Sequence, residues 1–259
     1  MEQLPQKPLV EALLEIRWAL QPSEVEGNLR DPGFPLMVGS FQERVKDLYP
    51  HYERLPAADF PDDMTPYVVK HRFRTGPNQW PVVQVGPGIV SLNFTSEYSW
   101  EIFAERAARV VADLRDAYSR HVESPLRPNN LMLRFINSIP NSADEPGMKF
   151  LAEKLHISVS LPAVFQPASS KATLTFAPDV DDAYGSSGVI GVGSGINQGQ
   201  PIIGLELQVV CSDSDLMPDL DEVGNWLDSA HQSIETWFFA LIDGELLDGF
   251  RKLDQEVLG

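Results

Sequence analysis

The chain has 259 residues, of which 43% are hydrophobic and 22% are charged, as expected for a globular protein with a well-buried core. Its formal net charge of −17 opposes binding to the phosphate backbone of nucleic acids, so we expect no nucleic-acid partner. No apolar run approaches the roughly 20 residues that cross a bilayer, and the N-terminal residues lack the regions of a secretory signal. We therefore expect a cytoplasmic protein without a membrane segment.

The first half of the chain is predicted to contain a strand, a short helix, three strands and a long helix. In residues 10–20, apolar side chains alternate with Glu15 and Arg17, which is the pattern of a half-buried strand. Residues 50–66 contain prolines and Asp-rich turns, and we interpret them as an irregular excursion. The remaining predicted elements are a helix at 41–49, strands at 67–74, 80–85 and 89–94, and a helix at 96–118.

The same order of elements then begins again. The second half is predicted to have a strand at 130–139, a helix at 148–155, strands at 172–177, 188–193 and 201–212, and a helix at 219–242. The fold class is therefore α+β: two pseudo-repeats of β-α-β-β-β-α, in which a curved antiparallel sheet packs on long helices. This order resembles the TATA-binding-protein-like and helix-grip folds. We expect the repeats at 1–128 and 129–259, either as two domains or as one continuous domain.

Charge divides unequally between the halves of the chain. Residues 1–150 hold 20 acidic and 16 basic side chains, whereas residues 151–259 hold 17 acidic and 4 basic ones. Such a surface favours a protein partner with a basic face. A homodimer is an alternative assembly.

No pattern of catalytic, cofactor-binding or metal-binding residues stands out. The histidines have none of the local spacings of zinc sites, and the glycine-rich stretch 185–197 lacks the lysine and the following helix of a phosphate loop. Cys211 lies in an apolar run, which favours a buried thiol over a nucleophile. We therefore predict no catalytic residue, no cofactor and no metal.

Two charged side chains in otherwise apolar strands are candidates for ligand or partner binding. Arg17, beside Trp18, and Arg134 occupy comparable positions in the first strand of each half, and a guanidinium pairs well with carboxylate or phosphate. The alternative is that each arginine faces solvent, and that Glu11 and Glu15 neutralise Arg17.

A histidine of the last predicted helix is a further candidate. His231 lies beside the apolar stripe of that helix, so it either packs at the edge of the core or faces a cavity as a hydrogen-bonding group or base.

Four segments carry a resemblance to a known family: LPQKPLVEALLEIRW (4–18), VGPGIVSLNFTSEYSWEIF (85–103), LMLRFINSI (131–139) and AHQSIETWFFALI (230–242). Together they resemble a sporadically distributed, uncharacterised bacterial family with a PLxEAxxEIRF-like strand, a GPG hairpin and an AHxxIxxxF helix. The resemblance implies an accessory protein, in defence or toxin–antitoxin settings. It adds Asn137 to the binding candidates and also covers Trp18, Trp100 and His231.

We expect, first, a non-enzymatic binding or regulatory protein that engages a protein partner. The alternative is a small-molecule sensor or hydrolase with a pocket between the sheet and a long helix, using Arg17, Arg134 and His231.

Overall fold

The computed structural model describes residues 4–23, 25, 27–95, 98–120, 126–141, 147–160, 162 and 173–252. The elements of the first half are β1 (Leu9–Trp18), β2 (Gln21–Pro22), β3 (Leu29–Arg30), α1 (Phe34–Val45), β4 (His51–Arg54), two short 3-10 helices (Pro56–Asp59 and Asp62–Met64), β5 (His71–Arg74), β6 (Val82–Gly86), β7 (Ile89–Phe94) and α2 (Trp100–Ser119). Those of the second half are β8 (Pro128–Pro140), α3 (Gly147–Lys154), β9 (Thr173–Phe176), β10 (Ser187–Asn197), β11 (Gln200–Cys211), α4 (Val223–Ile242) and α5 (Glu245–Arg251).

One antiparallel sheet runs through both halves of the chain. Its described strands follow the order β4-β5-β6-β7-β1-β8-β11-β10-β9. The halves meet where β1 pairs with β8, with Leu13 opposite Arg134 and Leu14 opposite Leu133. The predicted boundary between residues 128 and 129 therefore falls at the start of β8, and the two repeats share a sheet.

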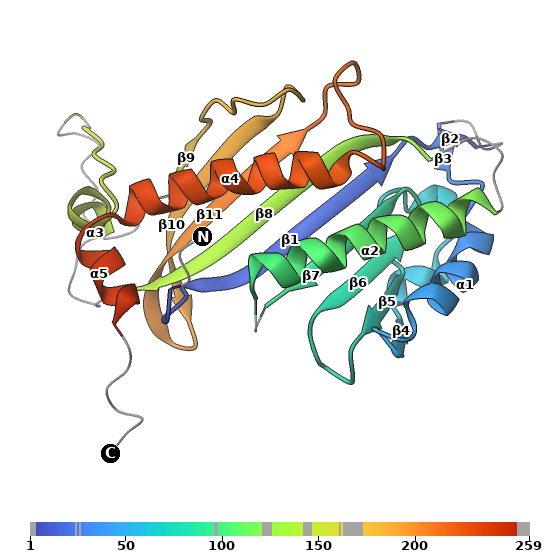
Figure 1. Ribbon diagram of the computed structural model, residues 1–259, viewed down its shortest axis with the longest axis horizontal. Helices are drawn as coiled ribbons and strands as arrows, with labels where there is room; N and C mark the ends of the chain where they lie inside the picture. The colour runs from blue at the N-terminus through green and yellow to red at the C-terminus, as the bar shows by residue number, and fades with distance from the viewer. Residues whose placement is uncertain are drawn as a thin grey trace.

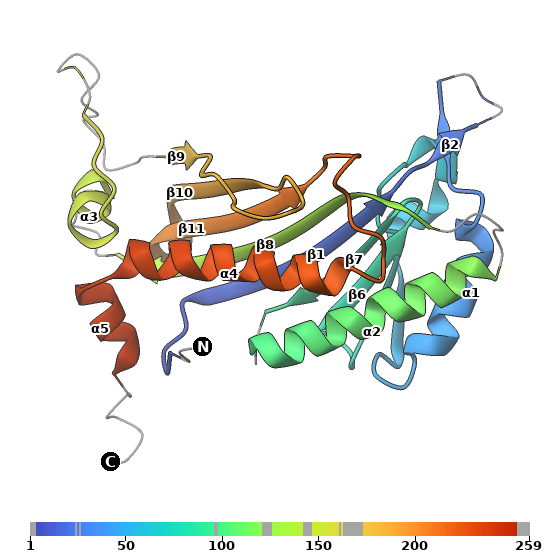
Figure 2. The same cartoon turned by 45° about the horizontal axis from the view of Figure 1, so that its top comes forward.

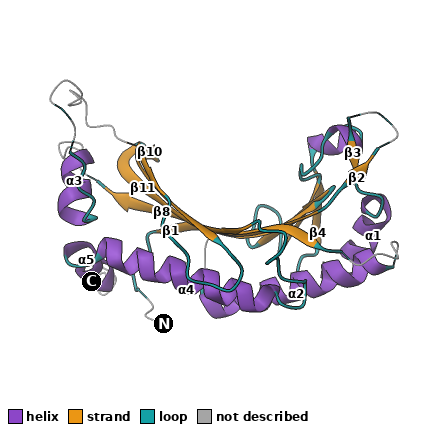
Figure 3. Cartoon of the chain, turned by 90° about the horizontal axis from the view of Figure 1, so that it is seen from above, coloured by secondary structure: helices purple, strands orange, loops and turns teal. Residues whose placement is uncertain are grey.

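The sheet is curved, and its two faces differ. Helices α2 and α4 lie along the convex face (Figure 1, Figure 2), whereas no described helix crosses the middle of the concave face (Figure 3). The alternation in β1 explains this: Ala12, Leu14, Ile16 and Trp18 are at most 1% exposed because they pack beneath the helices. The intervening Glu11, Glu15 and Arg17 are left on the concave face.

The two long helices follow from their apolar stripes. Phe103, Ala107 and Leu114 of α2 are buried, as are Trp226 and the other core residues of α4. Their spacing of three, four and seven residues places them on one side of each helix, toward the sheet. Among the described helices, none is long and apolar enough to cross a membrane.

The expected α+β class, with a curved antiparallel sheet on long helices, is confirmed. Several boundaries differ from the prediction. Helix α1 begins at Phe34, seven residues before the predicted start at residue 41. Pro35 fits the first turn of a helix, because no amide donor is needed there. Residues 51–54 of the predicted irregular excursion form β4, which pairs with β5. Helix α4 begins at Val223, after a turn in which the Glu222 amide donates to the Asp219 carbonyl. Residue 172, where a strand was predicted to begin, lies outside the described residues.

Candidate functional site

The five predicted binding residues lie in three separate places. Arg17 and Arg134 are on the concave face of the sheet, whereas Asn137 and His231 line a pocket on the helix-covered side. Trp18 belongs to neither place. Its side chain is 1% exposed, and its indole Nε1 donates to Asp31 Oδ2 over 2.8 Å. The strand period turns Trp18 to the opposite face from Arg17, so the structure assigns it to the core and not to a binding surface.

The two arginines of the concave face are held by glutamates. Arg17 Nε donates to Glu15 Oε1 over 2.7 Å, and its guanidinium lies 5.5 Å from the ring centre of Tyr67. Arg134 lies between Glu11 and Glu206, at 3.8 and 3.9 Å. The alternative in which neighbouring acids neutralise Arg17 is therefore seen, with Glu15 as its partner. Paired charges leave these arginines a weak electrostatic attraction for an anion.

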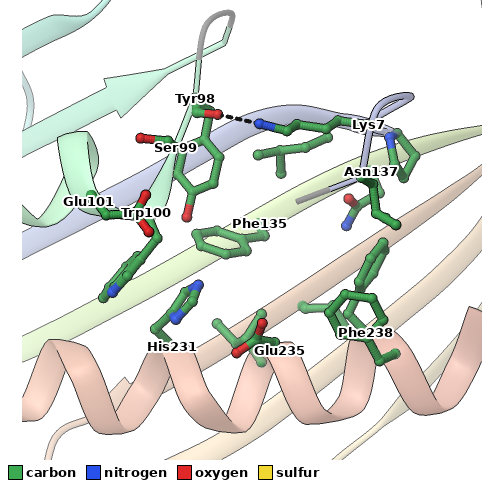
Figure 4. A pocket seen from close by; sticks show the side chains of 16 residues that line it. Lys7, Tyr98, Ser99, Trp100, Glu101, Phe135, Asn137, His231, Glu235 and Phe238 are labelled. Atoms are coloured by element: carbon green, nitrogen blue, oxygen red, sulfur yellow. Dashed lines mark hydrogen bonds between the residues drawn. The ribbon is translucent and has the colours of Figure 1, made fainter. Parts of the chain in front are cut away.

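The pocket opens between the first turn of α2 and the middle of α4, beneath β1 and β8 (Figure 4). Its empty volume, including open solvent at the mouth, is about 720 Å³. Most of the lining is aromatic or aliphatic, with a few polar groups among it. The lining residues are Leu4, Lys7, Pro8, Leu9, Tyr98, Ser99, Trp100, Glu101, Phe135, Asn137, Leu207, His231, Ile234, Glu235, Phe238 and Phe239.

The N-cap of α2 fixes the position of the pocket wall that the first half of the chain supplies. Ser99 is the N-cap of α2, and its hydroxyl accepts a hydrogen bond from the Ile102 amide over 3.3 Å. The preceding residue is held by the N-terminal segment, since Lys7 Nζ donates to the Tyr98 carbonyl over 2.8 Å (Figure 4). Tyr98 and Trp100 therefore have defined positions on either side of the cap.

His231 comes from α4 and is 6% exposed. Its ring stacks on Trp100 with centroids 3.6 Å apart and 11° between the planes, and it meets Phe135 edge to face. Burial lowers the pKa of His231 to about 4, although the charge of Glu101 opposes this shift. The imidazole is thus neutral near pH 7. A general base works best with a pKa near the operating pH, so this value does not suit His231 to the hydrolase alternative.

Tyr98 faces the same space from the other side of the pocket. Figure 4 shows its hydroxyl and the His231 ring directed toward each other. The hydroxyl oxygen is buried, and no described residue hydrogen-bonds to it. Burial raises the pKa of Tyr98 strongly, and the charges of Glu101 and Glu235 add to this shift. Both groups are therefore uncharged hydrogen-bonding groups in an apolar setting.

Asn137 lies on the sheet side of the pocket and is 3% exposed. Its Nδ2 donates to the Leu205 carbonyl of the neighbouring strand over 3.3 Å. This bond fixes the amide plane, and Asn137 is mainly a positioned part of the wall. Among the sequence candidates, the structure thus brings together Asn137, His231 and Trp100.

Sequence reasoning missed Tyr98, Lys7 and the phenylalanines of α4 as pocket residues. Tyr98 was predicted to lie in the first turn of the helix at 96–118, whereas α2 begins at Trp100 and leaves Tyr98 before its N-cap. A usable signal was the aromatic run Tyr98, Trp100 and Phe103 at a helix start, which predicts an aromatic cluster but not its partner on α4.

Metal and thiol chemistry find little support in the described part of the chain. No three His, Cys, Asp or Glu side chains gather there to hold a metal ion. Cys211 is buried, and burial raises the pKa of its thiol, which keeps the sulfur protonated near pH 7.

No protein-family model matches the chain, and no curated protein sequence matches it. The resemblance to a sporadically distributed bacterial family therefore stays a prediction. Among solved structures, a match is the TBP of Methanococcus jannaschii, with 12% identity over 88% of this chain and 97% of that one, and a TM-score of 0.25. At that score the likeness carries no argument about function.

Proposed function

We propose that this chain is a non-enzymatic binding protein that holds a small molecule in the pocket between the sheet and α4. The observation that supports this best is the Tyr98 hydroxyl. Its oxygen is buried, Tyr98 lines the pocket, and no described residue hydrogen-bonds to this oxygen. A buried polar group without a partner costs about 1–3 kcal/mol, and a ligand that hydrogen-bonds to it recovers that cost.

The pocket has walls from both halves of the chain. Tyr98 and Trp100 belong to the first half, whereas His231 and Phe238 belong to the second. A bound molecule would contact both halves at once, and this supports a sensing or regulatory role. The proposed setting, from the resemblance, is an accessory or defence-associated protein of the bacterial cytoplasm.

A dye titration tests this proposal when it is compared with a variant in which a larger side chain fills the pocket. N-phenyl-1-naphthylamine, an uncharged dye that becomes fluorescent in apolar surroundings, is titrated into the protein. We expect a saturable one-to-one increase in fluorescence. In Leu9→Trp the indole occupies the pocket, and the increase is lost. Val10→Trp is the matched control, because the neighbouring residue is 38% exposed and does not line the pocket. A response that never saturates, or that Leu9→Trp leaves intact, would contradict the proposal.

A second candidate function is binding of a basic protein partner at what we term the acidic end. It comprises the acidic residues of two loops, 177–186 and 212–222: Asp179, Asp181, Asp182, Asp213, Asp215, Asp219, Asp221 and Glu222. The loops touch, since a Cβ on Gly185 would lie 2.9 Å from Leu216 and 3.6 Å from Asp213. Leu216 is 46% exposed among these acids, and Arg115 pairs with Asp221. Charge and an exposed apolar side chain together favour a basic partner.

Cytochrome c serves as a basic probe for the acidic end. We expect weak binding at about 50 mM salt. This binding should be lost at about 300 mM, because the screening length becomes shorter as salt is added. Asp213→Lys with Asp215→Lys should abolish it, whereas Glu43→Lys, an exposed residue of α1, should not. Equal binding by both variants would rule out the acidic end as the contact surface. Size-exclusion chromatography of the same samples tests the homodimer, which is proposed as an alternative assembly.

A further inference from the structure

Two uncharged hydrogen-bonding groups face one apolar space in the pocket. Tyr98 Oη is a donor and acceptor with no partner among the described residues. The neutral imidazole of His231 has one donor and one acceptor nitrogen. Figure 4 shows the two groups on opposite sides of the space between α2 and α4. A hydroxyl placed between them can accept from one group and donate to the other, and so gives the buried Tyr98 hydroxyl the hydrogen bond that it lacks.

The walls beside this pair favour a flat apolar body. Phe135 meets Tyr98 and His231 at centroid distances of 5.5 and 5.7 Å, in both cases close to edge to face. Phe238 lines the other end of the pocket. Aromatic side chains prefer such offset and edge-on arrangements with other rings. An aromatic ring is therefore a good match for the space beyond the hydroxyl position.

The pocket disfavours both a positively and a negatively charged ligand. Burial disfavours a cation at His231 and an anion at Tyr98, as the pKa of each group reflects. Charged side chains of the lining are Lys7, Glu101 and Glu235, of which Lys7 and Glu101 are exposed. The two carboxylates oppose an anion. A cation would gain from them only at the mouth, and would lose its hydration farther in.

Resting on the proposed function, we infer that the pocket binds an uncharged aromatic molecule bearing a hydroxyl group, with its ring against Phe135 and its hydroxyl between Tyr98 and His231.

A matched series of probes tests the ligand class. p-Cresol, p-xylene, p-toluate and 4-methylbenzylammonium share one ring and differ in a hydroxyl, methyl, carboxylate or ammonium-bearing group. Displacement of N-phenyl-1-naphthylamine gives the relative affinities. We expect p-cresol to bind about tenfold more tightly than p-xylene, and the two ions more weakly than both. Tyr98→Phe should bring the ratio of p-cresol to p-xylene close to one.

The control variant is Tyr49→Phe. Tyr49 is 2% exposed, and its hydroxyl also lacks a partner among the described residues, but it does not line the pocket. It should leave the affinity ratio unchanged. Removing an unsatisfied hydroxyl should not lower the melting temperature of either variant, so loss of folding would not confuse the result.

The outcomes separate the two proposals. If p-xylene binds as tightly as p-cresol, or if an ion binds best, the inferred ligand class is wrong while the small-molecule function stands. The same holds if Tyr98→Phe keeps the preference for p-cresol. If no probe displaces the dye, and the dye itself is insensitive to Leu9→Trp, both proposals fall.

Discussion

His231 of α4 stacks face to face on Trp100 at the first turn of α2, with ring centroids 3.6 Å apart and 11° between their planes. This contact joins residues that are 131 positions apart, and it links the two long helices beside the pocket. Because it connects the halves outside the sheet, we expect it to contribute to the stability of the pocket.

Removing the indole should loosen this junction. We expect Trp100→Ala to lower the free energy of unfolding by about 2 kcal/mol, less than for a fully buried tryptophan because Trp100 is half-buried. Urea denaturation measures the change. Ile102 lies on the same helical turn and is 46% exposed, so Ile102→Ala should lower the free energy of unfolding much less. Equal costs would show that the stack contributes nothing of its own.

Acid should weaken the fold through His231. Burial lowers the pKa of the native histidine to about 4, whereas the unfolded chain titrates near 6.5, so the unfolded state takes up the proton first. The stability contributed by the neutral ring is present above about pH 6.5 and falls as the pH drops toward 4. The loss is on the order of 2–3 kcal/mol. Urea denaturation at several pH values measures it.

His231→Phe isolates this effect, because phenylalanine can keep the stack on Trp100 without titrating. The pH dependence of the variant should be shallower than that of the wild type between pH 7 and 4. Burial also lowers the pKa of His71, and that contribution has the same sign in both proteins and cancels in the comparison. Identical pH profiles would mean that His231 is not buried as described.

Asp31 should be among the most sensitive positions of the first half. This side chain is 3% exposed and accepts hydrogen bonds from the Trp18 indole, the Tyr118 hydroxyl and the Gly33, Phe34 and Gly88 amides. Asp31→Ala leaves these donors buried without a partner, and we expect a loss of about 3 kcal/mol or more. Thermal unfolding measures it, with Asp59→Ala at an exposed carboxylate as the comparison. A loss below about 1 kcal/mol would contradict the role given to Asp31.

Periodicity in the sequence predicted most of the sheet and both long helices, since burial on one side forces a regular spacing. Glu15 and Arg17 in β1, and Phe103 and Leu114 in α2, were placed on the correct faces by that spacing alone. The same reasoning failed where regular spacing is absent. Strand β4 is a short polar segment, and it is stabilised by pairing with β5, which no local pattern reveals.

The pocket could be predicted only in part. The helical stripe placed His231 at the edge of the core, and the resemblance pointed to Asn137 and Trp100. What periodicity could not predict is which elements meet: the pocket forms because β1 and β8 pair and so bring the start of α2 near the middle of α4. The unpartnered hydroxyl of Tyr98 is a further consequence of that packing, since tyrosine in a loop ordinarily keeps its hydroxyl in water.

The most direct measurement of the central claim is the NMR spectrum of the His231 imidazole during a titration with p-cresol. If the pocket binds hydroxylated aromatic molecules, the ring signals of His231 shift in a saturable manner in the wild type and in Val10→Trp, and do not shift in Leu9→Trp. If the signals stay unchanged up to millimolar p-cresol, or shift equally in Leu9→Trp, the ligand site is not where we place it.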